Sequence, residues 1–97
     1  MDLKPSYVHG ASPAQLIGDT IGTHFDRVAA KHARREALVV RHQDVRWTWA
    51  DLKHRVDNLA CGLRRLGLAP GERIGIWSQN CAEWVLTQFA TAKAGLI

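Results

Sequence analysis

One short segment, Trp77-Ser78-Gln79-Asn80, places polar side chains where chemistry could occur. It joins a predicted strand to a predicted helix. Ligands of open α/β sheets bind outside the carboxyl ends of the strands, and the N-terminus of the following helix favours anions. The plainer interpretation, which we favour, is that Asn80 caps the helix. Glu83, three residues later, would return a hydrogen bond to the cap.

Histidine and aspartate offer a second combination. His54 and Asp57 are one helical turn apart, where an acid and a base can meet. A solvated polar helix face explains this pair better. The five histidines include no pair at the i, i+4 spacing of a helical metal site, and the glycines form no phosphate-binding loop. We therefore assign no catalytic residue, no cofactor-binding residue and no metal-binding residue.

The net charge of +4 raises the question of nucleic-acid binding. Two sets of basic residues could form a patch: Lys31, Arg34 and Arg35, and Lys53, His54, Arg55, Arg64 and Arg65. Acidic residues such as Asp51 and Asp57 lie among them. We therefore favour the interpretation that these residues form the solvated faces of amphipathic helices.

The elements that would position these residues begin after an extended lead-in, residues 1–19. Thr20 is the expected N-cap of a first helix, whose apolar stripe consists of Ile21, Phe25, Val28 and Ala29. Apolar runs at 36–40 and 45–49, separated by a polar turn, predict a β-hairpin.

A second helix is expected to start at Thr48, with Asp51 completing a capping box, and to carry an apolar stripe through residue 66. Gly62 inside this helix predicts a close backbone contact. Residues 73–77 predict a strand, with Gly75 allowing a second close approach.

A third helix at 81–94, ended by Gly95, is apolar on nearly every side, so we expect it to be covered on more than one side. Leu96 and Ile97 would begin another strand, which completes a βαβ unit of a parallel sheet. The sequence therefore predicts a βαβ unit of which only the first two residues of the second strand are present. We expect the four tryptophans to fill the core: Trp47, Trp49, Trp77 and Trp84.

The composition is that of a globular chain, with 46% hydrophobic residues among 97. No signal peptide or membrane-spanning run is recognised, so the expected location is the cytoplasm. Cys61 and Cys81 fit no metal or redox spacing and are expected to be reduced and structural.

Together these segments resemble the start of the AMP-dependent synthetase and ligase family, the adenylate-forming enzymes. The resemblance rests on the order of EALVV at 36–40, WTWADLKHRVDNLACGLRRLGL at 47–68 and APGERIGIWSQNCAEWVLTQFATAKAGLI at 69–97. The lead-in segments SYVHG at 6–10 and LIGDTIG at 16–22 are similar to bacterial fatty-acyl-CoA synthetases. The match covers the chain from Ser6 onward.

The resemblance implies the fold class: α/β, an incomplete fragment of the large N-terminal domain of an adenylate-forming enzyme, with residues 20–97 as the partial domain. Family members use MgATP to convert a carboxylic acid into an acyl-adenylate, release pyrophosphate, and transfer the acyl group to coenzyme A. ATP, Mg²⁺, coenzyme A and a fatty acid would thus serve the full-length enzyme. The family's catalytic and binding motifs lie beyond residue 97, so the chain alone is expected to be inactive and loosely packed.

Two other hypotheses remain open at this point. The chain could be a stand-alone interaction module derived from that region, or a basic nucleic-acid-binding domain. The first predicts a native gene that ends after residue 97. The second predicts nucleic-acid affinity that falls steeply with salt.

Overall fold

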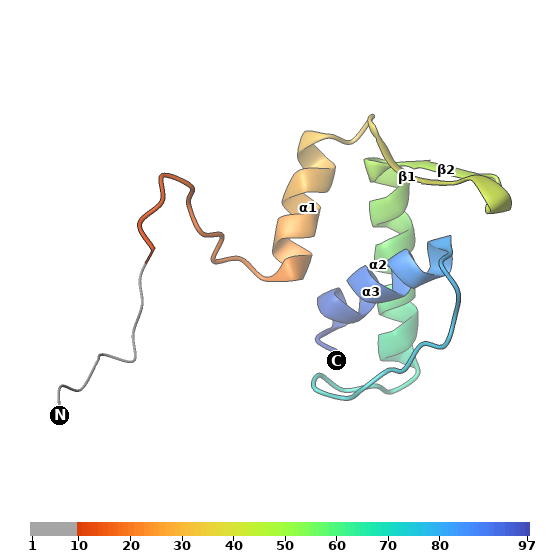
Figure 1. Ribbon diagram of the computed structural model, residues 1–97. Helices are drawn as coiled ribbons and strands as arrows, with labels where there is room; N and C mark the ends of the chain where they lie inside the picture. Colours follow the sequence, from red (N-terminus) through yellow and green to blue (C-terminus); the bar gives the residue numbers. More distant parts are fainter. Residues whose placement is uncertain (1–9) are drawn as a thin grey trace, which may run out of the picture.

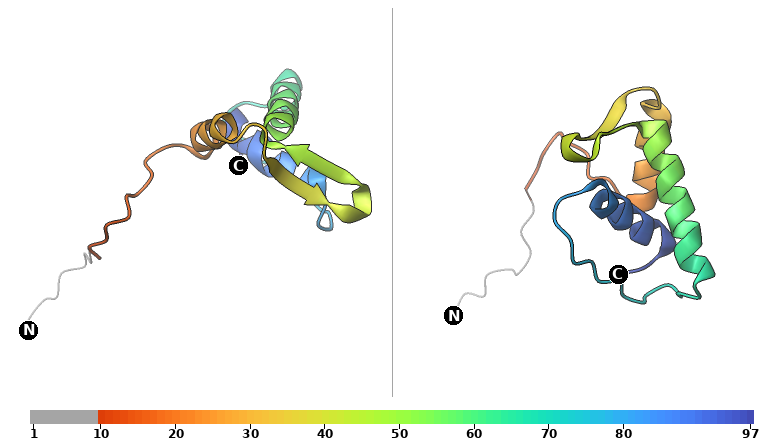
Figure 2. Two further views of the ribbon diagram at one scale, coloured as in Figure 1. Left: turned by 90° about the horizontal axis from the view of Figure 1, so that it is seen from above. Right: turned by 90° about the vertical axis from the view of Figure 1, so that its right-hand side faces the viewer.

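The computed structural model describes residues 10–97 (Figure 1). Its elements are helix α1 (Ile21–Lys31), strand β1 (Glu36–Val40), a 3₁₀ turn η1 (Arg41–Gln43), strand β2 (Val45–Thr48), helix α2 (Trp49–Arg65) and helix α3 (Ala82–Ala94). Residues 10–19 contain no helix or strand and run away from the body in both Figures 1 and 2. The earlier part of the expected lead-in lies outside the described residues.

Helix α1 begins as the sequence predicts. The Thr20 hydroxyl accepts a hydrogen bond from the Thr23 N–H at 3.1 Å, which satisfies one of the free donors of the first turn. Phe25 and Ala29 of the predicted stripe are buried, whereas Ile21 is 64% exposed. The inner part of the stripe thus meets the core, and its first residue does not.

Strands β1 and β2 form the predicted hairpin. They pair antiparallel from Glu36 opposite Thr48 to Val40 opposite Val45, with an irregularity between Glu36 and Leu38. The turn closes through Asp44, which has a left-handed backbone (φ 52°) that Asp tolerates better than most residues. The hairpin therefore follows from local sequence signals.

Helix α2 opens with the predicted capping box, in which the Thr48 and Asp51 side chains each bond the other's backbone N–H. Leu52, Val56 and Ala60 are buried on one face, whereas Leu66 is 78% exposed. The expectation of a close contact at Gly62 is wrong, because a side chain there would meet open space. The apolar stripe of α2 therefore packs on the core as far as Leu63 and does not reach Leu66, which follows the helix.

Helix α3 lies across α2 and also packs on α1 (Figures 1 and 2). Its C-terminal Gly95 has the predicted left-handed conformation (φ 76°). Gly22 lets α1 approach α3 closely, since a Cβ there would lie 3.0 Å from Lys93 Cγ. The Phe25 and Phe89 rings lie 4.7 Å apart at this junction, where Phe89 packs against the buried core cluster.

The predicted strand at 73–77 is not formed as a strand within the described residues. Two backbone hydrogen bonds join this segment to the last residue: Ile97 N–H donates to Glu72 C=O and Ile74 N–H donates to Ile97 C=O, both at 2.9 Å. This is the parallel pattern of the expected βαβ unit, limited to one pair of residues. The expected close approach at Gly75 is wrong, because that position faces open space.

The tryptophans divide between the core and the surface. Trp47 and Trp49 pack against the core, as predicted. Trp77 is fully exposed and Trp84 is 38% exposed, so the expectation that all four are buried is wrong.

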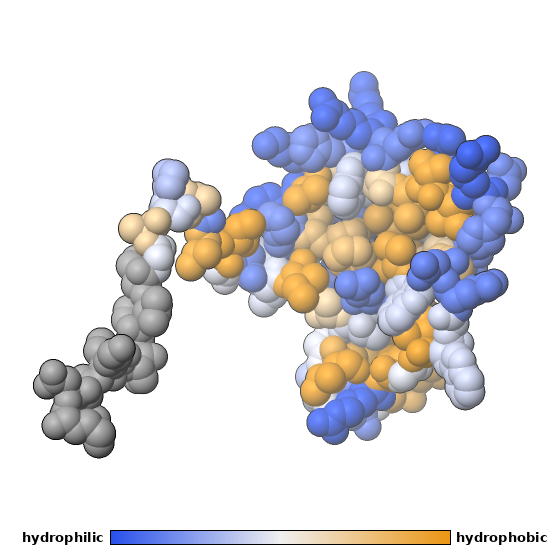
Figure 3. Space-filling model, viewed as in Figure 1, coloured by the Kyte–Doolittle hydropathy of each residue, from blue (hydrophilic) through white to orange (hydrophobic). Residues whose placement is uncertain are grey.

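Cys61 and Cys81 are free thiols, but Cys61 is exposed and fills no core position. Figure 3 shows apolar surface gathered over the middle of one face of the body.

Candidate functional site

The segment from Trp77 to Asn80 is exposed at the N-terminal end of α3. The Ser78 hydroxyl donates to the Gln79 C=O at 2.9 Å and lies 3.3 Å from the Cys81 sulfur. The expectation that Asn80 caps the helix is wrong. Cys81 occupies the cap position, and its side chain makes no capping bond.

Gln43, from the hairpin turn, serves as the cap instead. Its Oε1 accepts a hydrogen bond from the Ala82 N–H at 2.8 Å, and its Nε2 donates to a Glu83 carboxylate oxygen at 2.9 Å. The hydrogen bond from Gln43 is the largest of the contributions that lower the pKa of the Glu83 carboxyl below its ordinary value. One amide thus satisfies a free donor of the helix and holds its acidic residue.

Nothing in the local sequence around α3 pointed to Gln43. Capping rules search within about three residues of a helix start, whereas Gln43 lies 39 residues before Ala82. The weak signal available was that Cys81, next to Asn80, is a poor capping residue. The contact depends on how the hairpin sits against α3.

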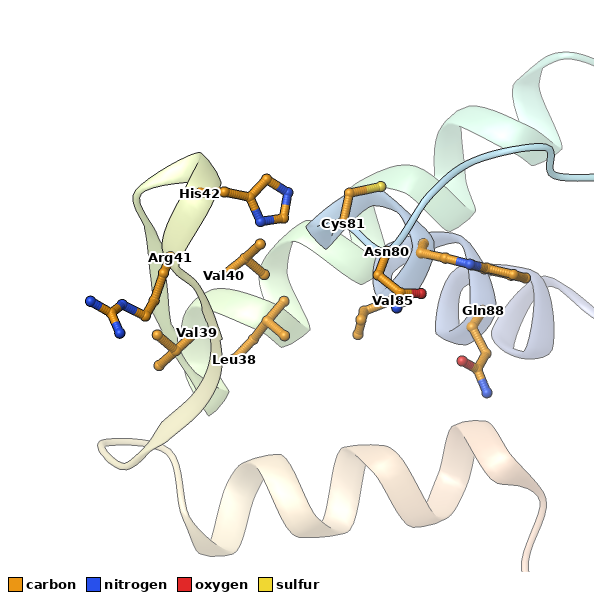
Figure 4. Close-up of a pocket in the computed structure, with 10 residues that line it drawn as sticks. Leu38, Val39, Val40, Arg41, His42, Asn80, Cys81, Val85 and Gln88 are labelled. Atoms are coloured by element: carbon orange, nitrogen blue, oxygen red, sulfur yellow. The ribbon is translucent and has the colours of Figure 1, made fainter.

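An open groove runs beside this junction (Figure 4). Its volume is about 520 Å³, and its lining comes from β1, η1 and the first turns of α3. The lining residues are Leu38, Val39, Val40, Arg41, His42, Asn80, Cys81, Trp84, Val85 and Gln88. The lining combines apolar side chains with the polar side chains of Arg41, His42, Asn80 and Gln88, which suits packing or binding. Residues 10–97 hold no group of three His, Cys, Asp or Glu side chains placed to share a metal ion.

The structure separates the two members of the imagined acid–base pair. His54 lies 3.2 Å from the Asn58 amide, whereas Asp57 accepts hydrogen bonds from Lys53 at 2.5 Å and from Lys93. Burial is the largest single influence on Asp57 and raises its pKa, but the two lysine bonds together lower the pKa below its ordinary value. The solvated-face interpretation therefore holds for His54, while Asp57 serves an ion cluster.

That cluster joins all three helices and consists of Asp26 on α1, Lys53 and Asp57 on α2, and Lys93 on α3. Lys93 lies 2.6 Å from Asp26, and its side chain is only 15% exposed. Lys53 lies 3.4 Å from Asp26, and its bond to Asp57 raises the pKa of Lys53. Two positive and two negative charges compensate each other here, so the cluster fastens helices together.

Part of the second basic set also makes contacts within the body. The Arg55 guanidinium lies over the Trp47 ring at 4.4 Å, and Arg64 donates to the Ala94 C=O at 3.4 Å. With Lys53 held by carboxylates and His54 beside the Asn58 amide, four of its five members make contacts within the body. Within residues 10–97, no helix has the length and apolar character needed to cross a bilayer.

Comparisons with known proteins give one consistent result. The family model for AMP-binding enzymes matches residues 25–97. The human medium-chain acyl-CoA ligase ACSF2, mitochondrial, is 48% identical over 92 residues, which is 95% of this chain and 15% of that protein. The putative acyl-CoA synthetase YngI of Bacillus subtilis is 37% identical over 84 residues, which is 87% of this chain and 15% of that protein.

The fold agrees with the sequence match. A putative long-chain-fatty-acid CoA ligase of Rhodopseudomonas palustris superimposes with a TM-score of 0.75 at 38% identity, covering 81% of this chain and 20% of that one. The chain thus spans about 15% of the length of the curated relatives it matches. Family model, sequence relatives and fold all lead to the same conclusion: this chain belongs to the AMP-binding enzyme family.

Proposed function

We propose that this chain is the N-terminal part of an ATP-dependent fatty acid–CoA ligase, in which it has a structural role. The observation that carries this proposal is the 48% identity to a protein named as a medium-chain acyl-CoA ligase, extended over 95% of the chain. Relatives this similar in sequence, with the same local fold in a related CoA ligase, support the same reaction class.

The proposed reaction has two steps. The carboxylate of a fatty acid attacks the α-phosphorus of ATP, forming an acyl-adenylate and releasing pyrophosphate. The thiol sulfur of coenzyme A then attacks the acyl carbon, its proton is lost to solvent or a base, and AMP leaves. Mg²⁺ would neutralise the phosphate charge in the first step.

The contacts of three carboxylates support the expectation that the described residues hold neither ATP nor Mg²⁺. The carboxylates of Asp26 and Asp57 are occupied by Lys53 and Lys93, and Glu83 is held by Gln43. We therefore propose that ATP and Mg²⁺, together with coenzyme A and the acid, bind elsewhere in a longer polypeptide. Residues 20–97 would form a partial domain of that polypeptide.

Two expectations from the sequence stay predictions. The cytoplasmic location is one, and the mammalian relatives carry the word mitochondrial in their names. The other is that the chain does not bind nucleic acid. The Arg55, Arg64 and Lys53 contacts favour it, because these side chains are engaged within the body.

The test compares the longer polypeptide with the 97-residue chain in a pyrophosphate-release assay containing MgATP, a fatty acid and coenzyme A. We expect release that depends on the fatty acid from the longer protein, and none above a no-protein blank from the chain alone. A longer protein that releases no pyrophosphate with any of a series of fatty acids would contradict the proposed substrate class. Activity of the 97 residues alone would contradict the structural role.

A further inference from the structure

The β-hairpin is firmly held at the end where its strands meet the helices. The Trp49 N–H donates a hydrogen bond to the Arg35 C=O at 3.0 Å, which ties the end of β2 to the start of β1. Leu38 and Trp47, one from each strand, also pack against the core. This end of the hairpin is therefore fixed by both a backbone bond and burial.

The opposite end, the hairpin tip (residues 41–44), has less support. Three of its four residues are exposed, and none belongs to the core cluster. Among residues 10–97, every hydrogen bond from the tip to α3 comes from Gln43. Its Oε1 accepts from the Ala82 N–H at 2.8 Å, and its Nε2 donates to Glu83 at 2.9 Å. One amide side chain thus makes both bonds between the tip and α3.

Open space separates the hairpin from α3 beside this contact. The groove of about 520 Å³ has β1 and η1 as one wall and the first turns of α3 as the other (Figure 4). Leu38 and Val40 line the first wall, and Trp84 and Val85 line the second. A space of this size means that close packing between the walls does not hold the tip, which leaves the two Gln43 bonds to do so.

We propose that these two bonds, the Gln43 latch, hold the hairpin tip against α3, and that the tip swings away from the groove when they break. Glu83 is exposed and Gln43 only half-buried, so water competes for the bonds and their net strength is modest. Opening would widen the groove and uncover Cys81, a half-buried free thiol on the wall opposite His42 (Figure 4). The latch does not depend on the proposed reaction.

Alkylation of the intact protein by iodoacetamide, read at each cysteine by mass spectrometry, tests the latch. Gln43→Ala should raise the rate at Cys81 about 5- to 30-fold, the factor by which losing bonds of this strength shifts an opening equilibrium. The rate at Cys61, an exposed thiol on α2, should not change. Arg41→Ala is the matched control, because Arg41 belongs to the same tip but points away from α3 (Figure 4), and it should leave the Cys81 rate at the wild-type value.

An exchange of the two partners makes the test specific to the hydrogen bond between them. Gln43→Glu places a second carboxylate beside Glu83 and should open the latch as Gln43→Ala does. Adding Glu83→Gln puts a donor opposite the new acceptor, so the double variant should return the Cys81 rate toward the wild-type value.

Three results would overturn the latch: an unchanged Cys81 rate in Gln43→Ala, a parallel rise at Cys81 and Cys61, which would show general loosening, or a double variant that reacts as fast as Gln43→Glu alone. A Cys81 that reacts in none of the proteins would also overturn it, because the groove would then be closed to solvent in every state.

Discussion

The helical body and the segment from residue 66 to residue 81 differ in how completely each buries its apolar side chains and pairs its polar groups. In the body, Val56 is completely buried, the aromatic rings of Phe25 and Phe89 pack together, and four charged side chains neutralise one another. In the segment, Leu66 and Trp77 project into open space. The most exposed apolar residues of the segment thus lack cover, although Leu68 and Ile74 pack against the core.

The difference follows from the hydrogen-bonding of helices and strands. A helix satisfies its backbone groups within itself, so only its apolar face needs a partner, and the three helices supply that partner to one another. A strand needs a neighbouring strand for its backbone groups. Residues 73–77 have such a neighbour only at Ile97, and they remain open beyond it.

The largest expected effect contrasts an aromatic residue from each region. Phe25→Ala should destabilise the chain by about 3–5 kcal/mol, because it opens a cavity among Phe89, Trp49 and the core of α2. Trp77→Ala should change the free energy of unfolding by less than about 0.5 kcal/mol, since Trp77 is exposed. Urea unfolding of both variants measures this. Equal losses would show that the two regions do not differ as described.

A pair of glycines tests the close packing of the body. Gly22→Ala should destabilise by about 1–2 kcal/mol, because the new Cβ would press on Lys93 between α1 and α3. Gly62→Ala is the control, and it should stabilise by about 0.5–1 kcal/mol, because that helical position faces open space. Thermal unfolding of both variants decides between them. A gain at Gly22 as large as that at Gly62 would mean that the helices are free to separate.

The cap of α3 lies where the two regions meet. Gln43→Ala should cost about 1 kcal/mol, since it removes the acceptor for Ala82 N–H and the donor to Glu83. Asn80→Ala should cost less than about 0.5 kcal/mol, because the Asn80 side chain makes no capping bond. The two unfolding free energies, measured in urea at pH 7, should differ in this order. The opposite order would restore Asn80 as the cap.

The smallest expected effect is the pH dependence of the ion cluster. The lysine bonds lower the pKa of Asp57, so its contribution to stability is present above its ordinary value of 3.8 and is lost as the pH falls through the lower, folded-state value. Asp57→Asn should remove that part of the decline below about pH 4, on the order of 1 kcal/mol or less because the side chain is partly exposed. Urea unfolding between pH 2 and pH 6 measures it. An unchanged decline in the variant would show that Asp57 is not tied to the lysines.

Local signals predicted the elements that form through local contacts. The Thr20 cap, the Thr48–Asp51 capping box, the hairpin and Gly95 were all read correctly, because each depends on residues only a few positions apart. Apart from the Asn80 cap, the predictions that failed concerned partners distant along the chain. Burial of Trp77, close approaches at Gly62 and Gly75, and a complete strand at 73–77 all required neighbours that residues 10–97 do not supply.

The sequence by itself determined where α1, α2 and the hairpin begin, the family, and the start of a parallel pair at Ile97. Only the tertiary structure decided that Gln43 caps α3, that Gly22 lies against Lys93, and that Asp57 bonds lysines in place of His54. The physical reason is the sequence separation over which each kind of signal acts. Capping and periodicity act within one or two helical turns, whereas these contacts join residues 36 to 71 positions apart or choose among several nearby charges, and only the packing of the helices sets those distances.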